Sequence, residues 1–275
     1  MKRIGIVYHP LNKGAIDLAQ KIAGILDSED VTCWFCSAWE GQQLSKRVVD
    51  TDLILTVGGD GTILRTAQAL VSHSIPLTGI NMGKLGFLTE LTADETADKL
   101  PSLLAGEGWI DERFMLEVEL ESKQKGKGKK YFVLNDAVIA RGEIARIINV
   151  EAEIDDEPLT TYKADGVIVA TATGSTGYSL ACGGPILHPQ AMQFLLVPIV
   201  PHLSLNNTLV LPPEAKVKLR IGPIHKAVLS VDGHISLPLG SNVSITVKNS
   251  KLKTRFLRTS TRDSFYSMLE QKLKG

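Results

Sequence analysis

Apolar residues in the first hundred positions alternate between short continuous runs and runs with helical spacing. The continuous runs have the length of buried strands and cover residues 2–8, 31–36, 53–57 and 75–80. Residues 15–26 place apolar side chains three or four positions apart, as one face of a helix requires, and residues 63–71 and 94–104 are also predicted helices. Strands that alternate with helices predict an α/β domain with a parallel sheet, whose ligands bind at the carboxyl ends of the strands.

After Trp109 the pattern changes to alternating apolar and polar residues. Residues 112–121 alternate, and a polar stretch rich in lysine and glycine at 123–130 predicts an exposed hairpin tip before another extended run at 131–140. Further predicted strands cover residues 147–154, 166–172, 208–211, 215–221, 227–231 and 243–248. The sequence therefore predicts a second, mainly β domain, built as a sandwich or as layered sheets.

We place the domain boundaries where these patterns change. Residues 1–108 form the predicted α/β domain, and residues 109–250 form the predicted β-rich domain. Residues 251–275 include a short predicted helix at 264–274. We expect this C-terminal segment to pack back on the first domain.

The composition provides no net charge that attracts a large partner. Thirty lysine and arginine residues balance thirty aspartate and glutamate residues in a chain of 275, so no overall field favours nucleic acid or an acidic membrane. The start, MKRIGIVYH, has no apolar signal core, and no later stretch approaches about eighteen uninterrupted apolar residues. We therefore expect a cytoplasmic protein that binds small anionic ligands, and neither nucleic acid nor a membrane.

The three cysteines, Cys33, Cys36 and Cys182, are too few and too odd in number for a disulfide scaffold. Cys33 and Cys36 form a C-x-x-C pair, a spacing found in redox and metal sites. Their segment, VTCWFCSA, has the pattern of a strand, in which residues three positions apart point to opposite faces. We therefore interpret both cysteines as packing residues.

The stretch LILTVGGDGT, from Leu53 to Thr62, ends a predicted buried strand in a glycine-rich turn. Glycines let the backbone turn tightly and approach a ligand, and successive N–H groups in such a turn bind anions. The apolar stretch from Ile63 adds the positive end of a helix dipole, so phosphate is the predicted ligand. The spacing matches neither the P-loop motif nor the G-x-G-x-x-G dinucleotide motif, because Leu64 replaces the third glycine.

Asp60 is unusual in a phosphate site, because its carboxylate repels phosphate unless a cation lies between them or the carboxylate accepts a proton. Phosphoryl transfer supplies both conditions, since a divalent metal bridges phosphate oxygens and a carboxylate orients or deprotonates the attacking hydroxyl. The alternative interpretation is a simple turn in which Asp60 caps a helix. Both interpretations remain open at this point.

Three further polar stretches interrupt the predicted β domain. Asn135 and Asp136 break an apolar run, and an amide next to a carboxylate suits a base edge and a ribose diol. The loop TATGSTGYS at 171–179 is rich in hydroxyls and glycine, and Tyr178 suits stacking on a ring. Residues 232–234, Asp-Gly-His, end another strand. Each stretch taken alone also fits an ordinary turn.

Taken together, these motifs resemble the NAD kinase family in content and order over nearly the whole chain. The resemblance includes the glycine loop, NMGKLGFLTEL at 81–91, Asn135–Asp136, the loop at 171–179 with the Gly-Gly-Pro that follows it, and the Asp-Gly at 232. The glycine loop alone is shared with diacylglycerol kinases. The resemblance implies an α/β N-terminal domain with a parallel sheet, a mainly β C-terminal domain that binds the dinucleotide, an active site between them, and a homodimer or homotetramer.

The resemblance also implies an activity, which is transfer of the terminal phosphoryl group of ATP or polyphosphate to the adenosine ribose 2′-hydroxyl of NAD, giving NADP. Asp60 is the implied proton acceptor, with Gly61 beside it and Arg65 near the phosphates. The implied divalent cation is Mg²⁺, held by the phosphates of the donor rather than by protein ligands. The positions that match the family's other dinucleotide contacts are Phe87, Asn135, Asp136, Arg146, Lys163, Asp165, Thr173, Thr176, Gly177, Tyr178, Ala181 and His234.

The chain departs from the family pattern at several of these positions. The family usually has glutamate at Asp136, alanine at Gly177, serine at Ala181, a polar residue such as glutamine at His234 and arginine at Lys163. Asp136 keeps the charge but reaches one methylene less, and Lys163 meets phosphate as a point charge rather than as a planar fork.

Two other functions fit parts of the sequence. One is a lipid or sugar kinase that shares only the glycine loop. The other is a non-catalytic NAD(P) sensor that binds the dinucleotide without transferring phosphate. A labelled-ATP assay that offers NAD against diacylglycerol separates the first alternative, and tight dinucleotide binding without ATP consumption indicates the second.

Overall fold

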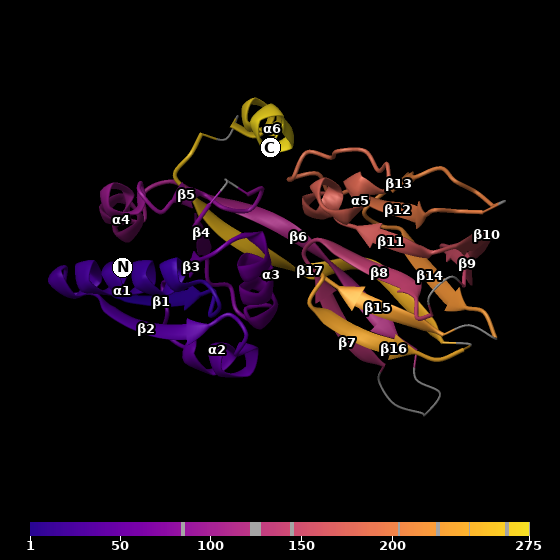
Figure 1. The fold of residues 1–275 in the computed structure, drawn as a ribbon, viewed down its shortest axis with the longest axis horizontal. Helices are drawn as coiled ribbons and strands as arrows, with labels where there is room; N and C mark the ends of the chain where they lie inside the picture. Colours follow the sequence, from indigo (N-terminus) through magenta and orange to yellow (C-terminus); the bar gives the residue numbers. More distant parts are fainter. Residues whose placement is uncertain are drawn as a thin grey trace. The chain divides into compact units, whose positions relative to one another are not determined.

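The computed structural model describes residues 1–83, 86–121, 128–143, 146–202, 204–223, 226–241, 243–261 and 264–274 (Figure 1). The chain forms two compact units, which we call unit 1 and unit 2. Unit 1 contains Met1–Glu112 and Lys253–Gly275, and unit 2 contains Arg113–Leu252. The chain therefore starts and ends in the same unit.

Unit 1 is built on a parallel sheet. Its strands are β1 (Arg3–Tyr8), β2 (Thr32–Ser37), β3 (Leu53–Val57) and β4 (Leu77–Asn81), in the order β2, β1, β3, β4. The short strand β5 (Leu91–Thr92) and the end of β17 (Ser244–Arg258) also pair with β4 in parallel. The helices of this unit are α1 (Lys13–Ser28), α2 (Gly41–Arg47), α3 (Asp60–Ala69), α4 (Thr96–Ala105) and α6 (Ser264–Lys274).

Helices cover both faces of this parallel sheet. Helix α1 begins after Asn12, whose side chain accepts a hydrogen bond from the Ala15 N–H, and its apolar stripe packs with α4 on the face of the sheet that carries Ile4 and Leu55. Helix α3 packs on the opposite face, where Ile63 lies against Gly79. Every residue of β3 is buried, which explains its continuous apolar run. The loop after β3 therefore emerges at the carboxyl edge of a covered sheet.

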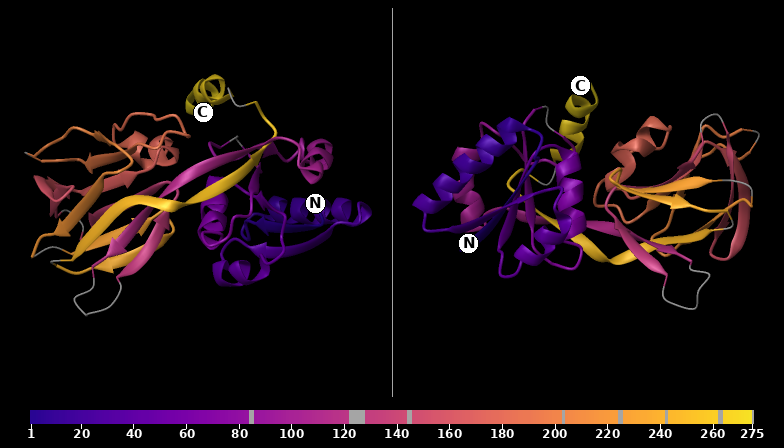
Figure 2. Two further views of the ribbon diagram at one scale, coloured as in Figure 1. Left: turned by 180° about the vertical axis from the view of Figure 1, so that it is seen from behind. Right: turned by 60° about the horizontal axis from the view of Figure 1, so that its bottom comes forward.

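Unit 2 is a sandwich of two sheets. Among the described residues, one has six antiparallel strands in the order β13, β12, β11, β8, β15, β16, and the other contains β10, β9, β14 and β17, with β6 beside β17 and β7 beside β6. Figure 2 shows the strands of this unit from two further directions. Both sheets contribute side chains to one apolar core, which includes Leu116, Ile139, Val167 and Leu219. The fold class predicted from the sequence is therefore confirmed, as an α/β N-terminal domain and a mainly antiparallel β C-terminal domain.

The strands of unit 2 have the following bounds. They are β6 (Trp109–Leu120), β7 (Lys129–Val133), β8 (Asp136–Arg141), β9 (Ile148–Ile154), β10 (Glu157–Ala164), β11 (Gly166–Ala170), β12 (Phe194–Ile199), β13 (Leu209–Leu211), β14 (Lys216–Ile221), β15 (Ala227–Val231), β16 (Ile235–Leu239) and β17 (Ser244–Arg258). Strands β6 and β17 each contribute residues to both units. The 3₁₀ turn η1 (Thr173–Thr176) and the short helix α5 (Tyr178–Ala181) follow β11.

Several elements differ from the sequence prediction, and among them the strands β10 and β5 were not predicted. The run at 131–140 is two strands in different sheets, because the chain turns between Val133 and Asp136. Strand β12 was not predicted, and it contains Pro198, which weakens a strand pattern. Strand β16 contains Pro238, which weakens a strand pattern. Strand β17 continues to Arg258, ten residues beyond the predicted strand.

The structure also bears on the sequence expectations for the cysteines and for the hairpin tip. Cys33, Cys36 and Cys182 are free thiols, and the first two lie on the strand β2, as predicted. Most of the predicted hairpin tip at 123–130 lies outside the described residues. Within the described part of the chain, no helix combines the length and the apolar character needed to cross a membrane.

Two glycines of unit 1 provide a matched test of its packing. A Cβ on Gly5 would overlap the ring of Trp34, which is held by a 3.0 Å hydrogen bond from its Nε1 to Thr51 Oγ1. A Cβ on Gly24, within α1, would meet no atom within 4 Å. We expect Gly5→Ala to destabilise the protein by about 1–3 kcal/mol and Gly24→Ala to stabilise it by about 0.5–1 kcal/mol. Urea unfolding of both variants checks this, and a stable Gly5→Ala protein would contradict the packing of β1.

Candidate functional site

The glycine loop after β3 is a tight turn that leads directly into α3. Gly58 packs against Thr62, and a Cβ on Gly58 would overlap the Thr62 hydroxyl. In contrast, Cβ atoms on Gly59 and Gly61 would meet nothing within 4 Å. Helix α3 begins at Asp60, three residues earlier than predicted. The backbone around Gly59 and Gly61 is therefore open to a ligand at the positive end of a helix dipole.

The Asp60 carboxylate binds a neighbouring loop rather than its own helix. The N–H of Phe87 donates to Oδ2 at 2.9 Å, and the N–H of Leu88 donates to Oδ1 at 3.1 Å. Gly59 is the N-cap of α3, and no side chain caps this helix. The alternative in which Asp60 is only a helix cap is therefore wrong. A carboxylate has about four acceptor positions, so two remain after these bonds.

Gly86 permits this close approach. A Cβ on Gly86 would overlap Oδ1 of Asp60. The Gly86 N–H donates to Thr89 Oγ1 at 2.9 Å, which closes a short turn over residues 86–89. Nothing in the local sequence distinguishes Gly86 from an ordinary loop glycine, so its contact with Asp60 was not foreseen.

Arg65 and Phe87 are the other predicted residues in unit 1. The guanidinium of Arg65 lies 4.4 Å from the centre of the Trp39 ring, a cation–π contact, and His9 meets the same ring edge-on at 4.7 Å. Lys272 of α6 lies 5.3 Å from the Phe87 ring centre. Arg65 is thus one turn into α3, as predicted, and rests on an aromatic side chain.

In unit 2, the structure brings two of the predicted polar stretches into direct contact. The Thr171 N–H donates to Asn135 O at 2.9 Å, and the Thr171 hydroxyl donates to Leu134 O at 2.5 Å. A Cβ on Gly174 would overlap the Asn135 carbonyl, so only glycine allows the loop at 171–178 to lie this close. Asn135 Oδ1 is buried and has no hydrogen-bond partner within the described part of the chain. This amide oxygen is an acceptor positioned for a ligand.

Asp232 holds the Asn135–Asp136 turn in place. Its carboxylate accepts hydrogen bonds from the N–H groups of Leu134, Asn135 and Asp136, at 3.0, 2.7 and 3.2 Å, and its own N–H donates to Asp136 O at 2.9 Å. Asp232 has a φ of 48°, in the left-handed region. His234, two residues on, lies 3.0 Å from Asp232 O through Nδ1. Asp232 thus supports the turn, a role that the sequence alone does not reveal.

The Asp136 side chain lies in an environment that disfavours its charge. It is 7% exposed, and burial, followed by the nearby charge of Asp232, raises its pKa from an ordinary value of 3.8 to about 7. The Cβ of a residue at Gly177 would lie 3.7 Å from Asp136 Oδ2 and from Asn135 Nδ2. Gly177 therefore leaves space directly above both predicted ligand residues.

The remaining predicted residues divide into two groups. Thr173, Thr176, Tyr178 and Ala181 belong to η1 and α5, the segment that follows β11, and Thr173 Oγ1 accepts a hydrogen bond from the buried Arg113 at 3.3 Å. The others lie on exposed or half-buried strands and loops. Asp165 pairs with Arg141 at 3.3 Å, Arg146 pairs with Glu143 at 3.3 Å, and Lys163 is exposed on β10.

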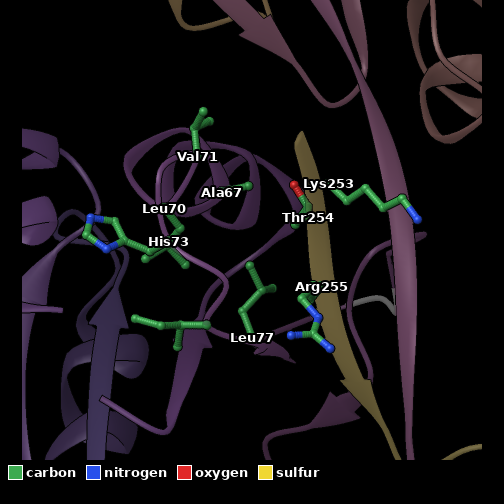
Figure 3. A pocket seen from close by; sticks show the side chains of 9 residues that line it. Ala67, Leu70, Val71, His73, Leu77, Lys253, Thr254 and Arg255 are labelled. Atoms are coloured by element: carbon green, nitrogen blue, oxygen red, sulfur yellow. The ribbon is translucent and has the colours of Figure 1, made fainter. Parts of the chain in front are cut away.

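Unit 1 also contains a small pocket, whose lining residues are separate from the predicted site residues. Its lining comes from the end of α3, the start of β4 and the start of the unit 1 part of β17, as Figure 3 shows for Ala67, Leu70, Leu77 and Arg255. Ala67 is seven residues after Asp60, which corresponds to about 10 Å along a helix. None of the predicted site residues lines this pocket.

Models of two protein domains match successive parts of the chain. The model of the ATP-NAD kinase N-terminal domain matches residues 28–108, and that of the ATP-NAD kinase C-terminal domain matches residues 134–259. A Dehalococcoides mccartyi protein named NAD kinase is 48% identical over 274 residues, covering 100% of this chain and 96% of the relative. The chain belongs to the NAD kinase family.

More distant members of the NAD kinase family have the same fold. A Chloroflexus aurantiacus NAD kinase is 37% identical and covers 100% of this chain and 99% of its own. The structure of yeast NADH kinase complexed with NADH superposes with a TM-score of 0.87 at 25% identity, covering 100% of this chain and 88% of that one. The Archaeoglobus fulgidus NAD kinase in complex with ATP gives a TM-score of 0.79 at 25% identity, covering 99% and 98%.

The raised pKa of Asp136 predicts a pH-dependent stability. Between about pH 4 and pH 7 the folded protein binds a proton at Asp136 that the unfolded chain has lost, so stability falls as the pH rises through this window. Asp136→Asn removes this loss. We expect the variant to gain stability relative to the parent protein from pH 4.5 to pH 8, by at most about 4 kcal/mol.

Urea unfolding of both proteins at the two pH values measures this difference. Asp17→Asn, on the exposed face of α1, is the matched control for loss of a surface carboxylate. A stability difference for Asp136→Asn that stays constant with pH would show that Asp136 is ionised throughout.

Proposed function

We propose that this protein transfers the terminal phosphoryl group of ATP to the 2′-hydroxyl of the adenosine ribose of NAD, giving NADP and ADP. The NAD kinase family membership supports the reaction, and the ATP and NADH complexes of its structural relatives support the two substrate classes. The observation that carries the proposal is the Asp60 carboxylate, which is held at the start of α3 by two backbone N–H groups and retains acceptor capacity.

In the proposed reaction, the ribose 2′-oxygen forms a bond to the terminal phosphorus of ATP while the bond from that phosphorus to the bridging oxygen of ADP breaks. Asp60 accepts the hydrogen bond from the 2′-hydroxyl and takes its proton as the new bond forms. In a loose transition state the proton leaves late, so Asp60 acts chiefly by orienting the hydroxyl. The open backbone at Gly61 provides N–H groups near the phosphates, and Arg65 follows one turn later.

The dinucleotide is proposed to bind through the polar residues of unit 2, together with Phe87 of unit 1. Asn135 offers its buried amide oxygen, which suits an amino group of a base. Asp136, with its pKa near 7, suits a ribose diol, because it accepts a hydrogen bond when ionised and donates one when protonated. The other proposed contacts are Arg146, Lys163, Asp165, Thr173, Thr176, Gly177, Tyr178, Ala181 and His234.

Mg²⁺ is proposed to arrive with the phosphates of ATP. Among the described residues, no group of three or more histidine, cysteine, aspartate or glutamate side chains is arranged to hold a metal ion. The open space at Gly59 and Gly61, next to the single carboxylate of Asp60, fits a cation that is held mainly by phosphate oxygens. The ion supplies charge neutralisation on the transferred group.

We also propose that the protein acts in the cytoplasm as a homodimer or homotetramer. The three free thiols are typical of a reducing compartment, and the balanced charge gives no support to binding of nucleic acid. The assembly is carried over from the resemblance to the family. Analytical ultracentrifugation of the purified protein measures it directly.

The test of the activity is a coupled assay with NAD, ATP and Mg²⁺, in which an NADP-specific dehydrogenase reports the product. Production of NADP supports the proposal. Binding of NAD without ATP consumption would instead indicate a sensor, and transfer to diacylglycerol in place of NAD would indicate a lipid kinase. Parallel reactions with inorganic polyphosphate identify the preferred donor.

Asp60→Asn tests the role of the carboxylate. The amide loses one acceptor oxygen and cannot take a proton, so we expect NADP formation to fall by about 10²–10⁴-fold. Binding of NAD is expected to change by less than about fivefold, because most of its proposed contacts lie in unit 2. Asp17→Asn serves as the control for a changed surface charge, and near-normal turnover by Asp60→Asn would overturn the proposed role.

A further inference from the structure

Arg258, at the end of β17, is a buried cation of unit 1 that makes several hydrogen bonds. Its side chain is 6% exposed. Nη1 donates to the carbonyl oxygens of Leu88 at 2.9 Å and Thr89 at 3.4 Å, and pairs with Glu90 Oε2 at 3.2 Å, while Nε pairs with Asp111 Oδ2 at 3.3 Å. The cost of burying this cation is therefore offset by two carboxylates and two carbonyls.

Glu90 ties the same segment to the loop at a second point. Its Oε1 accepts hydrogen bonds from the N–H groups of Thr259 and Ser260, at 2.8 and 2.7 Å. These contacts join positions about 170 residues apart in the sequence. Residues 88–90 are thus held from one side by the returning end of β17.

The loop that contains residues 88–90 also binds Asp60. The Leu88 N–H donates to Asp60 Oδ1, whereas the Leu88 carbonyl accepts from Arg258. One residue therefore binds the proposed proton acceptor with its N–H and the buried cation with its C=O. Among the described residues, Asp60 makes no direct hydrogen bond to Arg258 or to another residue of β17. Any influence of Arg258 on Asp60 therefore passes through the backbone of Leu88.

We propose that Arg258 is a positioning residue for Asp60, acting through the backbone of Gly86–Leu88; this inference rests on the proposed function. Arg258 holds the Leu88 and Thr89 carbonyls, and this fixes the direction of the two N–H groups that orient the carboxylate. Gly86 completes the arrangement, because its missing Cβ lets the carboxylate reach those N–H groups. A planar guanidinium can serve all four acceptors at once, and a lysine ammonium cannot.

The experiment compares Arg258→Met, Arg258→Lys and Gly86→Ala with the unaltered protein. We expect kcat to fall about 10–100-fold in Arg258→Met and Gly86→Ala, because small displacements of a catalytic group are costly. Arg258→Lys, which retains the charge, is expected to lie between these variants and the parent. KM for NAD and for ATP is expected to change by less than about threefold, since all proposed substrate contacts except Asp60 and Phe87 lie outside the altered contacts.

A second measurement does not depend on activity. Hydrogen exchange of the Phe87 and Leu88 amides, followed by NMR, reports whether these N–H groups remain bonded to Asp60. We expect exchange at both amides to be at least about tenfold faster in the three variants, with unchanged exchange in α1 and β1. Arg255→Met is the matched control, because Arg255 lies on the same strand, pairs with Glu112 and has a half-exposed side chain. Gly24→Ala is the control for an added methyl group.

The outcomes separate this inference from the proposed function. If the parent protein makes no NADP, the proposed function fails, and amide exchange alone decides whether Arg258 orders the loop around Asp60. If the parent is active but Arg258→Lys and Gly86→Ala keep normal kcat and normal exchange at Phe87 and Leu88, the inference is overturned. If Arg258→Met does not fold, Arg258→Lys and Gly86→Ala decide, because they introduce no unpaired buried carboxylates. An equal loss of kcat in Arg255→Met would also overturn it.

Discussion

The candidate site residues of each unit depend on one kind of interaction, in which a carboxylate accepts hydrogen bonds from consecutive backbone N–H groups. In unit 1, Asp60 binds the N–H groups of Phe87 and Leu88. In unit 2, Asp232 binds those of Leu134, Asn135 and Asp136. Charge-assisted bonds of this kind are stronger than neutral ones, so each acid orders a loop that has no regular structure of its own.

Glycine makes these carboxylate and loop contacts possible. Gly86 leaves room for the Asp60 carboxylate, and Gly174 leaves room for the Asn135 carbonyl. In both places a Cβ would overlap an oxygen atom, so the constraint is one of space rather than of backbone angle. The motifs are therefore rich in glycine for two reasons. Glycine lets one loop approach another closely, and it leaves the backbone at Gly59 and Gly61 open, as a phosphate requires.

The two acids nevertheless have different electrostatic consequences. Asp232 orders the turn that presents Asp136, and its charge also contributes to the raised pKa of that neighbour. The same carboxylate thus orders the turn and adds to the effect of burial, which is the larger cause of the raised pKa of Asp136.

The sequence by itself determined the elements and the chemistry of this protein. Continuous and alternating apolar runs predicted the α/β and β domains, because strand and helix periods are local properties. The glycine loop, Asn135–Asp136 and the loop at 171–179 were recognisable because each combines residue types that packing alone does not require. Strands β10, β12 and β16 were missed, and the last two contain a proline, which weakens a strand pattern.

Only the tertiary structure decided the partners of these residues. Asp60 binds Phe87 and Leu88, which are 27 and 28 positions away in the sequence. Asp232 binds Asn135, which is 97 positions away, and Arg258 binds Leu88, which is 170 positions away. No local pattern encodes such contacts, because they follow from the order in which the strands assemble into sheets. Packing of the sheet placed Asp60, the backbone of Phe87 and Leu88, and Arg258 within hydrogen-bonding distance of one another. The sequence names these residues, but only the fold sets the distances between them.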